Sequence, residues 1–128
     1  MKIIRGSELE YRPAGHENPL TPGVWKKVLF AKTAIQAGII QMINWSRLPA
    51  GSQFAAHYHE DMQEIFVMIE GTSELKVDGQ MYVLSPGDAA AIEPREVHQM
   101  CNRTDQDVMF LAMGIASGEG GQSVVVGN

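Results

Sequence analysis

The sequence predicts an all-β protein with one domain, built as an antiparallel β-sandwich or barrel. Its 128 residues are the length of one ordinary domain, and the 45% hydrophobic content is that of a globular protein. From Val24 onward, short apolar runs alternate with turn residues, and no convincing helix interrupts them. Short strands at regular spacing are typical of sandwiches and barrels.

The chain divides into an arm, a barrel and a tail. Residues 1–23 are expected to form an N-terminal arm, because residues 12–23 hold three Pro and two Gly, which favour loop or extended structure. Residues 24–116 are expected to form the barrel. Residues 117–128 are a Gly-rich tail with a short last strand, which we expect to pair with a neighbouring chain.

Nine runs have the composition of strands. The run that begins at Glu64 also fits a helical stripe, but it is interpreted as a strand because β-branched and aromatic residues dominate and Gly71 ends it. The Asp78–Gly79 pair predicts a two-residue hairpin turn, in which both residues adopt a positive φ. In chain order the runs are Val24–Phe30, Gly38–Trp45, Glu64–Glu70, Ser73–Val77, Gln80–Leu84, Ala89–Ile92, Glu96–Cys101, Val108–Met113 and Ser123–Val126.

Charge and cysteine content exclude several classes of function. The net charge is −5 and the chain has no basic block, so we expect no nucleic-acid partner and no binding to an anionic membrane. The single Cys101 excludes an internal disulfide and a cysteine-based zinc site. No apolar run approaches a membrane span, and the first residues lack the apolar core of a secretory signal, so a cytoplasmic protein is expected.

Three of the four histidines, with one glutamate, form a pattern that suits a metal ion. His57 and His59 flank one residue, so on a strand both imidazoles lie on the same face. Glu64 is expected at the start of the next strand, as its hairpin partner, and His98 comes from a later strand. Such a set of nitrogen and oxygen donors suits Fe, Mn, Ni or Zn as the divalent ion and leaves coordination positions open.

The spacing of these residues resembles a known family. The first motif of the cupin superfamily is reproduced by Gly51, His57, His59, Glu64 and Gly71. The second motif is resembled by Gly87, which lies in the turn Pro86–Asp88, and by His98 and Asn102 further on. One departure is Glu93, where the family usually has Pro; here Pro94 follows one place later. The resemblance implies a small single-domain conserved-barrel cupin, a double-stranded β-helix or jelly-roll barrel, with His57, His59, Glu64 and His98 as inward-facing metal ligands.

Strand alternation from these ligands predicts the substrate pocket. The expected lining of this pocket is mostly apolar and carries few charges. This favours a substrate with an apolar portion that is bound mainly through the metal. Cys101, at an odd offset from His98, is expected to point away from the metal. The inward residues are expected to be Met42, Gln53, Phe66, Met68, Met100 and Asn102, with Arg47, Arg95, Lys26 and Lys27 as candidate cations at the barrel mouth.

The resemblance leaves more than one function open, because one fold carries many activities. The first hypothesis is a metal-dependent enzyme, dioxygenase-like or using Lewis-acid chemistry, that acts on a small oxygen-bearing molecule. Glu64 is the candidate catalytic base, and Tyr58, Gln53 or Glu60 could assist. The alternatives are a non-catalytic module that binds a small molecule and an isomerase or epimerase of sugars. Outward apolar residues such as Val67 and Ile69 predict a homodimer.

Overall fold

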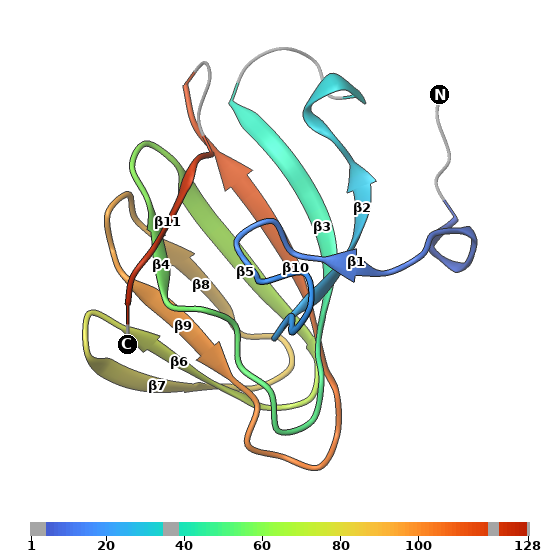
Figure 1. Cartoon of the computed structure of the whole chain (residues 1–128), viewed down its shortest axis with the longest axis vertical. Helices are drawn as coiled ribbons and strands as arrows, with labels where there is room; N and C mark the ends of the chain where they lie inside the picture. Colours follow the sequence, from blue (N-terminus) through green and yellow to red (C-terminus); the bar gives the residue numbers. More distant parts are fainter. Residues whose placement is uncertain (1–4, 35–38, 118–120, 128) are drawn as a thin grey trace.

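Two antiparallel sheets face each other in the structure (Figure 1), a computed structural model that describes residues 5–34, 39–117 and 121–127. In spatial order, the six-stranded sheet contains β1 (Arg12–Pro13), β2 (Trp25–Phe30), β3 (Ile40–Leu48), β10 (Val108–Ile115), β5 (Gln63–Glu70) and β8 (Ala89–Ile92). The five-stranded sheet contains β11 (Ser123–Val125), β4 (His57–His59), β9 (His98–Cys101), β6 (Ser73–Val77) and β7 (Gln80–Leu84).

The all-β prediction is confirmed. Among the described residues, helical structure is limited to two short 3₁₀ turns, Gly6–Glu8 and Lys32–Ala34. The strands β6, β7 and β8 have the predicted bounds, and the other predicted strands begin or end within a few residues of theirs. The predicted start of the second run, Gly38, lies outside the described residues. No helix in the described part of the chain is long and apolar enough to cross a membrane.

The hairpin between β6 and β7 has the predicted turn. Val77 pairs with Gln80, so Asp78 and Gly79 are the two loop residues. Both have a positive φ, 46° for Asp78 and 86° for Gly79. A turn of this kind matches the right-handed twist of the flanking strands, which explains why this pair is found between two alternating runs.

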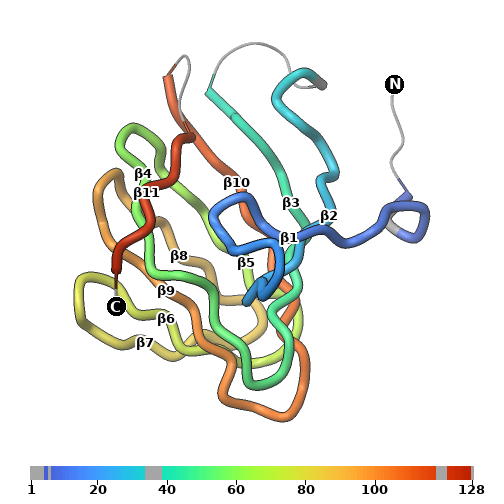
Figure 2. The backbone as a smooth tube through the Cα atoms, in the orientation of Figure 1, coloured from blue at the N-terminus to red at the C-terminus, as the bar shows by residue number. Residues whose placement is uncertain are grey.

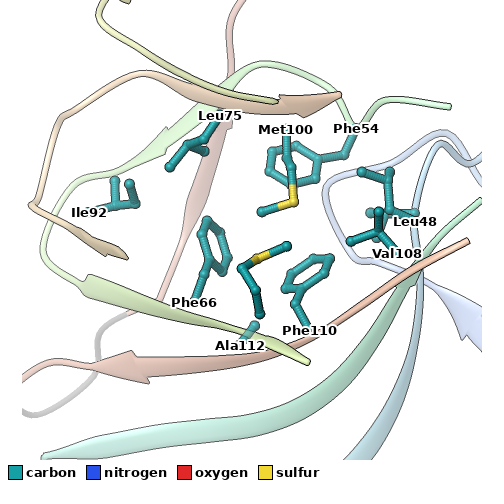
Figure 3. Close-up of a cluster of buried hydrophobic side chains, with 11 residues drawn as sticks. Leu48, Phe54, Phe66, Leu75, Ile92, Met100, Val108, Phe110 and Ala112 are labelled. Atoms are coloured by element: carbon teal, nitrogen blue, oxygen red, sulfur yellow. The ribbon is translucent and has the colours of Figure 1, made fainter. Parts of the chain in front are cut away.

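The apolar core lies between the two sheets. Side chains from both sheets meet there, because alternate residues of each strand point inward. Phe66 packs edge-on against Phe110, with 5.3 Å between the ring centroids, and Met100 lies close to Phe54 in Figure 3. The core contains Val24, Leu48, Phe54, Phe66, Met68, Leu75, Ile92, Met100, Val108, Phe110 and Ala112.

The connection from β4 to β5 differs from the predicted hairpin. β4 pairs with β9 and β11, whereas β5 pairs with β10 and β8, so the two strands belong to opposite sheets. The short segment between His59 and Gln63 therefore crosses from one sheet to the other. The expectation that Glu64 lies on the hairpin partner of the histidine strand is wrong: Glu64 faces the histidines across the barrel.

The first and the last strand, β1 and β11, both pair with strands of this barrel (Figure 2). β1 pairs with β2, and the loop that follows is held by Glu17, whose carboxylate accepts hydrogen bonds from the backbone N–H groups of Gly23 (2.6 Å) and Ala55 (2.8 Å). β11 pairs with β4 of the same chain, so the expected pairing of this strand with a neighbouring chain is replaced by an internal one. The division of the chain into an arm (residues 1–23), a barrel (24–116) and a tail (117–128) stays a prediction.

Candidate metal centre

Four buried side chains from three strands meet inside the barrel. The register places His57 of β4 directly opposite His98 of β9, and His59 lies one side-chain repeat further along β4. Glu64 reaches the same place from β5 in the other sheet. One ligand atom from each of the four side chains lies within 4.8 Å of all the others. Two sheets are therefore needed to assemble the group.

The three imidazoles are oriented by the backbone. A carbonyl oxygen only accepts hydrogen bonds, so Nδ1 of His57 and Nδ1 of His98 each carry the proton that they donate. Nδ1 of His59 can instead accept a hydrogen bond from the hydroxyl of Ser123, which lies 3.3 Å away. Anchoring of this kind is typical of histidines that bind metals. The acceptors are the carbonyl oxygens of Ala55 for His57 (2.7 Å), Glu96 for His98 (2.9 Å) and Gln122 for His59 (3.3 Å).

The contacts of Glu64 test whether a cation fits. Its Oε1 lies 3.3 Å from Nε2 of His59 and 3.1 Å from Nε2 of His98. Because Nδ1 of His98 already carries a proton, the contact of its Nε2 with Glu64 is satisfied only if that ring is doubly protonated or if a cation takes the place of the Nε2 proton. Three imidazole nitrogens and a carboxylate oxygen are donors that suit a divalent transition metal. The residues present therefore fit such an ion.

Electrostatics within the group follow from burial and from Glu64. Burial alone would raise the pKa of Glu64, but the hydrogen bonds with His59 and His98 outweigh it and hold that pKa well below its usual range. The pKa of His59 is raised, since the contact with Glu64 outweighs the effect of burial. Burial, with His16 and His98 nearby, lowers the pKa of His57 to about 3. His57 is thus neutral at pH 7, and its Nε2 lone pair is available to bind a metal ion.

A cavity of about 300 Å³ opens beside this group. The buried side chains of Phe54, Phe66 and Phe110, at the top of the apolar core, line its floor. Met42 and Met62 form part of its wall. Of the six pocket residues that alternation predicts, Met42 and Phe66 line this cavity. The predicted apolar character of the wall is present on this side.

The other four predicted pocket residues lie elsewhere. Met68 and Met100 are fully buried in the core, and Asn102 donates hydrogen bonds to the carbonyl oxygens of Leu48 and Gln106. Gln53 is exposed, and its Oε1 accepts a hydrogen bond from the thiol of Cys101. Alternation gives the face of a strand but not the depth along the barrel, so inward residues beyond the ligands fall in the closed, packed end.

Several other predicted residues lie away from the cavity. Glu60 and Arg95 form an exposed ion pair, and Arg47 pairs with Asp107. Lys27 lies over the ring of Tyr11, 4.8 Å from its centroid. Tyr58 lies between the two histidines of β4 and so points to the opposite face, and Cys101 is outside the cluster of ligand atoms. Of the predicted mouth cations, Lys26 lines the cavity.

Two features of this site are not predicted by the sequence pattern. His16 of the N-terminal arm lines the cavity and stacks on His57, with 3.9 Å between the ring centroids. Burial lowers its pKa, against the effect of Glu17. The second feature is a polar wall of Asn44 and Ser46 on β3, since the sequence does not decide which alternate residues of that strand point inward. Nothing in the proline-rich arm indicated that His16 enters the barrel.

Comparison with known proteins agrees with this geometry. A family model described as the cupin domain matches residues 44–114. The chain is 28% identical to the uncharacterized protein MJ1618 of Methanocaldococcus jannaschii over 68 residues. The matched segment covers 53% of this chain and 54% of that protein. The chain therefore matches about half the length of this curated relative.

Two solved structures share the fold. A protein of Thermotoga maritima, described as a predicted oxalate decarboxylase, is 24% identical, with a TM-score of 0.78 over 90% of this chain and 99% of that one. The polyketide cyclase RemF of Streptomyces resistomycificus is 18% identical, with a TM-score of 0.81, and the match covers 100% of this chain and 87% of RemF. At such identities the likeness shows the fold alone. Since the family model spans more than half of the chain, this protein belongs to the cupin domain family.

Proposed function

We propose that the protein is a metal-dependent enzyme that acts on a small, oxygen-bearing and partly apolar molecule, with oxidation of the dioxygenase type favoured over isomerase or lyase chemistry. The observation that carries the proposal is the convergence of four buried donors, His57, His59, Glu64 and His98. Three of them, His57, His59 and Glu64, line an open cavity. A bound divalent metal would supply Lewis acidity or activation of dioxygen. Mn, Fe, Ni and Zn all suit this donor set.

The side chains around the donors support a reaction site over a purely structural one. A closed structural site would surround the ion with protein ligands, whereas this group faces a space of about 300 Å³, the lower end of the range for ligand pockets. Phe66, Phe110 and Met62 offer apolar contact to a bound molecule. A small substrate would therefore be bound by its oxygen atoms at one end and by these side chains at the other.

Glu64 is proposed as the residue that moves a proton. Its Oε1 lies within 3.3 Å of Nε2 of two imidazoles, so its carboxylate is positioned at the centre of the group. Among the four donors it is the one whose removal from the metal would leave a free base close to the cavity. Its second carboxylate oxygen has no hydrogen bond in the described part of the chain.

An oxygen-consumption screen tests the proposal. Protein purified without an affinity tag and loaded with Fe or Mn is mixed with small diketones, catechols and enols in an oxygen electrode, and products are followed by mass spectrometry. We expect metal-dependent, saturable oxygen uptake with at least one of these compounds. Saturable binding with no chemical change in any bound compound would contradict the enzyme and favour the binding module; an isomerised product without oxygen uptake would contradict the oxidative class.

We also propose that the protein is a cytoplasmic homodimer. The outer face of the six-stranded sheet carries apolar side chains that are only partly covered, among them Val67 and Leu111, and Ile69 is 40% exposed. Apolar faces of this kind are usually covered in an assembly. The single cysteine and the acidic composition support a reducing, cytoplasmic location. Light scattering on a sizing column should give twice the mass of the chain.

A further inference from the structure

One wall of the cavity is polar, and none of its residues belongs to the metal centre. Lys26 of β2 and Ser46 of β3 are register partners, and Asn44 lies one inward repeat from Ser46 on the same strand. All three side chains line the cavity, as do the metal-centre residues His57, His59 and Glu64. The cavity therefore has two chemically different sides, with the apolar core as its floor.

Lys26 brings a positive charge into this space. Its side chain is half-buried, and its ammonium group forms no ion pair or hydrogen bond with any residue in the described ranges. Burial lowers its pKa, the neighbouring Arg12 lowers it further, and Glu64 acts in the opposite direction. A half-buried ammonium without a counter-ion is costly, so its place in the wall indicates an anion that binds there from solution.

Asn44 adds a second group that lacks a partner. Its side chain is 7% exposed, and its Oδ1 has no hydrogen-bond partner among the described residues. Buried amides in folded proteins are almost always hydrogen-bonded, because leaving one unpaired costs free energy. A polar group on a molecule inside the cavity would satisfy it.

The balance of charges in the cavity also favours an anionic ligand. In the chain alone, the charged side chains of the described cavity lining are those of Lys26, Lys32 and Glu64. A divalent ion in the metal centre would add two positive charges and leave the cavity with an excess of positive charge. A ligand with one negative charge would reduce that excess, whereas a neutral ligand would not.

We propose that the ligand of this cavity is a small organic carboxylate, with its carboxylate at Lys26, a neutral polar group at Asn44 and its apolar part on the phenylalanine floor. The inference rests on the proposed function and narrows its substrate class. Lys32 also lines the cavity, but at an exposed position, so Lys26 is the half-buried lysine of the described lining. One half-buried lysine suits a carboxylate, which carries a single charge, better than a phosphate, which usually meets several cations. A carboxylate at Lys26 adds a second anchor to the expected grip on the substrate by the metal.

Salicylate and salicylamide are a matched pair of probes for this inference. They have nearly the same shape and the same hydroxyl group, and they differ in the charge that Lys26 would recognise. Binding of each to the metal-loaded protein is measured by titration calorimetry, for the wild type, Lys26→Gln and Lys27→Gln. Lys27 is the next residue of β2 and points to the other face of the sheet, so Lys27→Gln removes the same charge outside the cavity.

We expect Lys26→Gln to weaken salicylate binding by about tenfold or more and to leave salicylamide binding within about twofold, because a charged hydrogen bond is lost in one case only. Lys27→Gln should leave both unchanged, and Lys26→Arg should restore most of the salicylate affinity. Equal weakening of both probes by Lys26→Gln, or no weakening of either, would overturn the inference. So would Lys26-dependent binding of phenyl phosphate together with no binding of salicylate.

Metal analysis of the same samples separates this inference from the proposed function. Lys26 is not among the four donors, so Lys26→Gln should keep the metal content of the wild type. If the wild type takes up no metal, the proposed function fails, and the comparison of the two probes is then made on the metal-free protein, where the Lys26 charge still acts. If metal is bound but the variant treats both probes alike, the carboxylate inference alone fails.

Discussion

Glu64→Gln is expected to weaken metal binding by about a hundredfold or more and to abolish turnover. The substitution keeps the size of the side chain and removes the negative charge that two imidazoles contact. Loss of a group that merely orients a ligand already costs about 10–100-fold in metal affinity, and loss of a direct ligand costs more. Removal of a general base costs a further factor of about 100 or more in rate. Metal competition titrations and single-turnover assays measure the two effects.

Glu70→Gln is the matched control, because Glu70 ends the same strand at an exposed position. It should keep both metal and activity. If Glu64→Gln also kept both, Glu64 would be neither ligand nor base, and the site would reduce to a three-histidine centre. If metal stayed and only activity disappeared, the base role would stand and the ligand role would be secondary.

Gly23→Ala is expected to destabilise the fold by about 1–3 kcal/mol or more and to loosen the arm that carries His16. A Cβ at Gly23 would collide with the backbone carbonyl oxygen of Gln53, which cannot move as a flexible side chain does. The same glycine is held at its N–H by Glu17, and its carbonyl oxygen accepts from the hydroxyl of Ser52. Urea denaturation measures the loss, and hydrogen exchange of residues 14–17 measures the loosening.

Gly15→Ala is the control for the arm. A Cβ at Gly15 meets no atom within 4 Å, so this change should leave stability within about 0.5 kcal/mol of the wild type. An unchanged urea midpoint for Gly23→Ala would mean that the arm shifts freely on the barrel. His16 would then not be held in the cavity by this contact.

Local features of the fold were predictable because they depend on neighbouring residues. The Asp78–Gly79 turn follows from the need for a positive φ at two successive positions, and the strand bounds around it follow from alternation. The pairing of β4 was not predictable in this way. The segment after His59 is as short as a hairpin loop, but it crosses to the other sheet, and a sequence pattern does not distinguish these two paths.

The four donors were predictable as a set because their spacing is a motif, whereas the pocket was only partly predictable. Phe66 lines the cavity as expected, but Met100, two residues beyond His98, is already in the packed core. His16 was not predictable, because its position depends on how the arm docks: Glu17 binds the backbone of Ala55 and so brings the neighbouring ring onto His57. Such long-range contacts leave no local pattern.

The metal content of the purified protein tests the central claim most directly. Inductively coupled plasma mass spectrometry on protein purified without an affinity tag should find one divalent transition metal ion per chain in the wild type. His59→Ala should lose most of it, because His59 supplies one of the four donors, while Tyr58→Phe, on the opposite face of the same strand, should keep it. Full metal occupancy in His59→Ala would contradict the assignment of this site.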